Sequence, residues 1–254
     1  MSKPRTYQTE AIIIKKTRLR EADVIFTFYT PNLGKIQAFA KSVRKTRSKM
    51  AGHLELLTYS QVSLARGRNL DTIIGSQTIN SFLPLKSDLW LTSFGLYVIE
   101  LVNQFTADNV ENPALFQLLR ETMEQLCRTG NRELTLRYFE LHLLDEVGYR
   151  PQLHQCVSCQ KPLEPVVNSF SPSSGGMLCP DCAVNHPSSY PLSLNAQKVL
   201  RLLQDSDYST VERLKIDAEL SRELEIVLSN YLKYLLEQEV RSAAWLYTLR
   251  QQIK

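Results

Sequence analysis

The segment Val24–Lys41, VIFTFYTPNLGKIQAFAK, predicts two β-strands joined by a tight turn. Its first seven residues are β-branched or aromatic, which is typical of strands. The next four, Pro31-Asn32-Leu33-Gly34, have turn composition, and Gly34 can adopt a positive φ there. The last seven alternate, with apolar side chains at every second position, as expected of a half-buried strand.

Similar β-rich runs flank this hairpin at Thr6–Lys15, Leu54–Ala65 and Leu70–Ile79. Arg66-Gly67-Arg68-Asn69 has the composition of a turn between the last two runs. Five short strands at this spacing are typical of an antiparallel barrel. We therefore predict that residues 1–82 form a partly open, five-stranded OB-fold, the kind of barrel that binds oligonucleotides.

Beyond Pro84 the apolar residues recur with the 3.6-residue period of amphipathic helices. Cap signals such as Asn112-Pro113 and Gly148 indicate where helices begin and end. The predicted fold class is thus α+β, with an α-helical domain over residues 83–254. Its predicted helices are Ser87–Phe105, Asn112–Cys127, Asn131–Gly148, Ser193–Gln204 and Ala218–Glu239, with a further helical turn near Trp245.

Residues 149–192 interrupt the helical pattern, and we refer to them as the inserted segment. They are rich in proline and hold four of the five cysteines of the chain. Cys156 and Cys159 form one C-x2-C pair, and Cys179 and Cys182 form a second pair after 19 intervening residues. This spacing is typical of a zinc site. Four thiolates leave no position for water, so we predict one structural Zn²⁺ that folds the segment.

The cysteines allow two other interpretations. A C-x2-C pair can be redox-active, but such a pair usually follows a strand and begins a helix, and here there are two pairs. Four cysteines can also hold an iron–sulfur cluster, although paired spacing favours zinc. His154 and His186 flank the pairs and could replace a ligand, but four suitable cysteines make that unnecessary.

Positive charge is concentrated near the N-terminus. Residues 1–80 carry 14 Lys and Arg against 5 Asp and Glu, a net charge of +9, whereas the remainder carries 16 against 21, a net charge of −5. A basic barrel indicates a polyanionic partner bound through its phosphates, with a steep dependence on salt. The predicted nucleic-acid contacts are Lys41, Arg44, Lys45, Arg47 and Lys49 in one basic loop, with Arg66 and Arg68 as second choices.

The aromatic residues of the predicted barrel allow two interpretations. Phe26, Phe28, Tyr29 and Phe39 could stack on bases if they face outward. A barrel also needs a core, which favours the interpretation that these side chains fill it.

No motif of a known catalytic site is present, such as a Walker loop, GxGxxG, HExxH or GxSxG, and we expect no enzymatic activity. The apolar runs are far shorter than the roughly 20 residues that span a bilayer, so no membrane partner is expected. Residues 1–10 are polar and lack the apolar stretch of a secretory signal. These features favour a cytoplasmic location, where cysteines stay reduced.

The order of several short motifs resembles the bacterial recombination mediator family RecO. The resemblance runs nearly from end to end of the chain and depends on order and spacing rather than on any single motif. The motifs are Glu10-Ala11-Ile12-Ile13-Ile14, Gly34-Lys35-Ile36, the basic loop before Leu54, Arg66-Gly67-Arg68, Tyr97-Val98-Ile99-Glu100-Leu101, Phe139-Glu140-Leu141 with Leu143-Leu144, Gly148-Tyr149, and Cys156-x2-Cys159.

This resemblance implies an OB-fold, a helical domain and a zinc-binding insertion. It also implies binding of single- and double-stranded DNA and annealing of complementary strands in DNA repair and recombination after DNA damage. The implied partners are RecR, single-strand-binding protein and, indirectly, RecA, which would be loaded on covered strands in the nucleoid. Two other hypotheses fit the charge and cysteines: an RNA-binding or ribosome-associated protein, and a zinc-dependent hydrolase.

Overall fold

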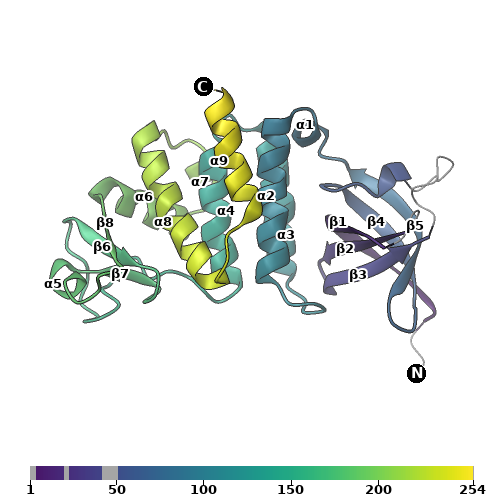
Figure 1. Cartoon of the computed structure of the whole chain (residues 1–254), viewed down its shortest axis with the longest axis horizontal. Helices are drawn as coiled ribbons and strands as arrows, with labels where there is room; N and C mark the ends of the chain where they lie inside the picture. The colour runs from purple at the N-terminus through teal and green to yellow at the C-terminus, as the bar shows by residue number, and fades with distance from the viewer. Residues whose placement is uncertain (1–3, 20–22, 42–50, 254) are drawn as a thin grey trace. The chain divides into compact units, whose positions relative to one another are not determined.

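The structure, a computed structural model, describes residues 4–19, 23–41 and 51–253 (Figure 1). It confirms the α+β class, with a five-stranded sheet first and helices after it. The chain divides into two compact units: Met1–Arg128 with Arg241–Lys254, and Thr129–Val240. In this division the strands that precede residue 82 and several helices that follow it belong to the same unit.

The five strands close into a barrel in the order β1-β2-β3-β5-β4. All neighbouring pairs are antiparallel except β3 and β5, which run parallel and share only the pairs Ala38–Asp71 and Phe39–Thr72. This order, with one weak seam, is the predicted OB-fold. The strands are β1 (Thr6–Arg18), β2 (Val24–Thr30), β3 (Gly34–Ala40), β4 (Tyr59–Ala65) and β5 (Asp71–Asn80).

Alternating apolar side chains fill the barrel, among them Phe28, Val62 and Leu64, each with an exposed fraction of 0%. The predicted strand from Leu54 is wrong over its first five residues. Leu57 has a φ of 57° and its N–H donates to the Ile13 carbonyl, so the chain bends before β4 begins. Leu54 is thereby buried in the barrel core instead of taking part in a strand.

Among the described residues, the first unit also contains the α-helices α1 (Leu83–Lys86), α2 (Leu89–Phe105), α3 (Pro113–Arg128) and α9 (Arg241–Ile253). Asp88, rather than the predicted Ser87, caps α2 by accepting the N–H of Leu91. α9 is longer than the helical turn expected near Trp245. It packs against α2, where the Glu100 carboxylate accepts the N–H groups of Arg241 and Ser242.

The second unit consists of packed helices and the inserted segment. α4 (Arg132–Glu146), α6 (Leu194–Asp205) and α8 (Ala218–Leu236) pack together, and α7 (Tyr208–Val211) contacts α6. The inserted segment contains α5 (Pro180–Ala183) and three short strands that the sequence pattern did not predict. They pair in the order β7-β6-β8 and are β6 (Asn168–Ser171), β7 (Gly176–Leu178) and β8 (Tyr190–Leu192).

The inserted segment gains its apolar contacts from the helices. Phe170 of β6 is fully buried and meets the ring of Tyr231 on α8 edge to face, with centroids 5.4 Å apart. The Tyr231 hydroxyl donates to the carbonyl of Tyr149 at the start of the segment. Across the described ranges, none of the helices combines the length and apolar content that a membrane crossing requires.

Candidate functional site

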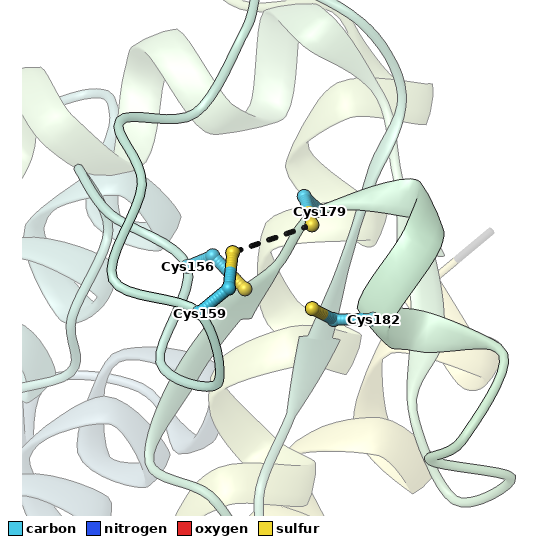
Figure 2. A group of neighbouring side chains, drawn as sticks. All are labelled: Cys156, Cys159, Cys179 and Cys182. Atoms are coloured by element: carbon cyan, nitrogen blue, oxygen red, sulfur yellow. Dashed lines mark hydrogen bonds between the residues drawn. The ribbon is translucent and has the colours of Figure 1, made fainter.

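The two cysteine pairs meet in the inserted segment (Figure 2). One thiol sulfur from each of Cys156, Cys159, Cys179 and Cys182 lies within 4.8 Å of the other three. Cys156 and Cys159 lie on a loop, Cys179 directly precedes α5, and Cys182 lies within that helix. The structure therefore brings together all four predicted ligands, and they could hold one metal ion.

Backbone hydrogen bonds fix the first pair. The N–H of Cys156 donates to the Lys161 carbonyl, and the N–H of Gln160 donates back to the Cys156 carbonyl at 2.8 Å. Gln160 adopts a φ of 60°, which lets the chain reverse between these contacts. The N–H of Val157 donates to the Met177 carbonyl and so ties the loop to β7 beside the second pair. Residues 20 positions apart in the sequence thus face one another.

The thiols differ in acidity. Burial raises the pKa of Cys156, but the N–H groups of Cys159, Cys179 and Ser158 stabilise its thiolate, and the balance lowers this pKa to about 6. A hydrogen bond with Cys179 raises the pKa of Cys182 to about 12. Backbone N–H groups directed at sulfur are typical of sites in which thiolates bind a metal.

The flanking histidines do not join this cluster. The Nε2 of His154 lies 3.0 Å from the carboxylate of Asp205, an acid that also pairs with Arg150. His186 is also not among the residues whose ligand atoms converge in the described ranges. This agrees with the interpretation that four cysteines suffice.

The predicted nucleic-acid contacts are only partly described. Lys41 is exposed just after β3, and Arg66 and Arg68 are exposed in the β4–β5 loop. The Arg66 guanidinium lies over the ring of Tyr7, 4.7 Å from its centroid. Four further predicted contacts lie outside the described residues: Arg44, Lys45, Arg47 and Lys49.

The aromatic residues of the barrel belong mainly to its core. Phe26, Phe28 and Tyr29 have exposed fractions of 1% or less, so they are not available to stack on bases. Phe39 is half-buried.

A cavity that the sequence pattern did not indicate opens beside the β3–β5 seam. It has a volume of about 510 Å³ and is lined by β3, the β4–β5 loop and the loop between α2 and α3. Lys35, from β3, is mostly buried, and its ammonium donates to the carbonyls of Asn103 and Thr106. No local pattern marks these residues, because the three segments are far apart in the sequence.

Two consecutive segments of the chain each match a model of a known protein family. Family models described as recombination protein O N terminal and recombination protein O C terminal match residues 1–82 and 86–244. The chain is 49% identical over 249 residues to the DNA repair protein RecO of Dehalococcoides mccartyi, with 98% of each chain covered.

More distant relatives match over nearly the same length. The chain is 41% identical to the DNA repair protein RecO of Roseiflexus sp. over 98% of this chain and 88% of the relative. It is 31% identical to that of Desulforamulus reducens, over 94% of this chain and 93% of the relative. These matches confirm the resemblance inferred from the motifs: the chain belongs to the RecO family of DNA repair proteins.

Proposed function

We propose that this protein acts in DNA repair and recombination as a mediator that binds DNA, anneals complementary strands and catalyses no reaction. The observation that carries the proposal is the match of both family models, which together span nearly the whole chain. Single- and double-stranded DNA would be the ligands. With RecR, the protein would help to load RecA on strands covered by single-strand-binding protein in the bacterial nucleoid.

The charge of the first 80 residues supports DNA binding through the barrel. Their net charge of +9 is suited to a phosphate backbone. Lys41, Arg66 and Arg68 are exposed at ends of barrel strands, and none has an acidic side chain within salt-bridge distance among the described residues. The basic loop at residues 41–49 would add its cations to the same barrel.

The same charge would favour annealing. Two complementary strands repel one another through their phosphates, and cations held between them reduce that repulsion. Binding through phosphates is independent of sequence, so any complementary pair could be brought together. Base pairing would then supply the specificity, and the protein would need no positioned nucleophile or general base.

Zinc is the metal that best suits the cysteine cluster. A tetrahedral ion with Zn–S bonds of about 2.3 Å places its sulfur ligands about 3.8 Å apart. The sulfurs of Cys159 and Cys179 are 3.8 Å apart (Figure 2). Four thiolates would close the coordination sphere, so the ion would hold the inserted segment folded and would not activate water.

The decisive experiment is a salt titration of oligonucleotide binding by the whole chain. Reversing the charge of Arg44, Lys45 and Arg47 together should weaken binding and annealing. It should also reduce the salt slope by about 0.7 for each single-strand phosphate that the variant no longer neutralises. The zinc content should not change. If annealing persisted in this triple variant, the basic loop would not be the surface that binds DNA.

A control variant distinguishes the loss of phosphate contacts in the basic loop from the general effect of a changed net charge. Reversing Lys198, Arg213 and Lys215 changes the net charge equally, but these exposed residues belong to the second unit. The control should retain the wild-type affinity apart from a small general effect of charge. If the zinc-loaded wild type did not bind polynucleotides in dilute buffer, the proposed function would be wrong.

A further inference from the structure

The cavity beside the β3–β5 seam belongs entirely to the first unit. Its volume of about 510 Å³ is within the range of roughly 300–1,000 Å³ that small-ligand sites occupy. It opens next to the β4–β5 loop, which carries Arg66 and Arg68. A molecule that contacts these arginines is therefore near the mouth of the cavity.

One wall of the cavity is fixed by Asp71 at the start of β5. One oxygen of its carboxylate accepts the Tyr7 hydroxyl, and the other accepts the N–H of Gly67 at 3.0 Å. Arg66 packs its guanidinium over the ring of Tyr7. Both the aromatic ring and the loop are thus held in place before any ligand binds, which lowers the entropic cost of binding.

The opposite wall is the loop between α2 and α3, and β3 holds it. The Lys35 ammonium donates to the carbonyls of Asn103 and Thr106, and the Lys35 carbonyl accepts the N–H of Asn109 at 2.9 Å. Gly34 has a φ of 62°, and a Cβ there would lie 1.9 Å from the carbonyl oxygen of Val110. The loop therefore lies directly against the backbone of the β2–β3 turn.

The lining between these walls is rich in amides. Asn32, Gln37, Asn69 and Asn109 all line the cavity, and within the described ranges no hydrogen bond occupies their side chains. Each amide offers both donors and an acceptor, as do the edges of nucleobases. These four side chains can therefore pair with a ligand without first breaking a contact within the protein.

The charges of the lining disfavour a phosphate in the interior. Asp71, Asp108 and Glu111 outnumber the two cations, Lys35 and Arg66. Lys35 is already occupied by the two carbonyls and by Asp108, 3.4 Å away. An anionic group would be repelled, whereas an uncharged, planar, polar group fits the amides and the Tyr7–Arg66 pair.

We infer that this cavity receives a single unstacked nucleobase from a DNA strand whose phosphates lie outside, along the exposed arginines of the β4–β5 loop. The inference rests on the proposed DNA binding and adds a base-binding site to it. The Gln37 and Asn69 side chains would donate to and accept from the edge of the base. An amide side chain can both donate and accept hydrogen bonds, so the site would tolerate different bases.

The test compares two single-stranded oligonucleotides of equal length and charge, one with thymine bases and one with abasic sugars throughout. The whole, zinc-loaded protein should bind the thymine strand about tenfold more tightly, since one buried base typically contributes that much. The double variant Gln37→Ala/Asn69→Ala should reduce this preference to about twofold, because it removes two hydrogen bonds to the base. The salt slope should be unchanged, because the variant retains every cation that binds phosphate.

The matched control is Gln61→Ala/Gln77→Ala, two amides that face each other across β4 and β5 and do not line the cavity. It should retain the full preference. Equal preference in the cavity variant and the wild type would overturn the inference. So would a wild type that binds both strands equally, although the proposed DNA binding would then stand. Failure to bind either strand in dilute buffer would refute both proposals.

Discussion

Replacing Lys35 by Met tests whether the cation at the β3–α2 contact is structural. In the structure its ammonium donates to the carbonyls of Asn103 and Thr106, at 2.8 and 2.6 Å, and lies 3.4 Å from the Asp108 carboxylate. Carbonyls at the C-terminal end of a helix lack partners within the helix, and a cation there satisfies them. Met keeps the unbranched apolar stem and removes only the charged donor.

The expected loss of stability can be worked out from these hydrogen bonds. A hydrogen bond from a charged donor contributes about 1.5–3 kcal/mol net. The Lys35 side chain is 12% exposed, so little water competes with it, but the freed carbonyls could become hydrated if the loop moved. We therefore take the lower end for each bond and expect the free energy of unfolding to fall by about 3 kcal/mol. With an m-value of about 2 kcal/mol/M, the urea midpoint of the first unit would fall by about 1.5 M.

Tryptophan emission measures this loss without interference from the second unit. The chain has two tryptophans, Trp90 and Trp245, and both belong to the first unit. The control is Lys41→Met, since Lys41 is exposed just beyond the same strand. Its effect on the free energy of unfolding should stay below about 0.5 kcal/mol, as is usual for an exposed charge.

In DNA binding the order of the two effects should be reversed, with Lys41 more important than Lys35. Under native conditions Lys41→Met should lower the salt slope of binding, whereas Lys35→Met should leave this slope unchanged, because the charge of Lys35 is already engaged by the protein. Equal urea midpoints for the two variants would refute the reasoning, since a charge with three close partners would then contribute no more than a solvated one.

Three further predictions concern other contacts. Glu100→Ala removes the acceptor for the N–H groups of Arg241 and Ser242, so it should destabilise the docking of α9 by about 2 kcal/mol. Hydrogen exchange in that helix should become faster, and unchanged exchange would contradict this. Gly34→Ala forces a Cβ to within 1.9 Å of the Val110 carbonyl oxygen, and we expect a destabilisation of about 3 kcal/mol and a lower melting temperature. An unshifted melting temperature would show that the loop between α2 and α3 is not held there. Removing the metal should open the inserted segment to proteolysis but leave the urea midpoint of the tryptophans unchanged, and equal resistance with and without metal would argue against a structural ion.

Periodicity and turn chemistry account for most of the elements. The hairpin at residues 24–41 is predicted with its turn, because alternation and a glycine that tolerates positive φ are local properties. The predicted strand from Leu54 is wrong over its first residues, since Leu57 takes a positive φ and donates its N–H to Ile13 of β1, a contact between residues distant in the sequence. The three strands of the inserted segment are three or four residues long, too short for alternation to mark them.

The amino-acid order alone determined which four thiols meet, because two C-x2-C pairs allow one tetrahedral centre whatever the path of the chain between them. It also determined where positive charge is concentrated. Tertiary structure decided which cations remain available to bind a phosphate. The Lys35 ammonium donates to carbonyls at the end of a helix nearly 70 residues away, whereas Lys41 is exposed. It likewise decided that amides from three distant segments line one cavity, since a concave surface depends on how the backbone folds and has no signature in local sequence.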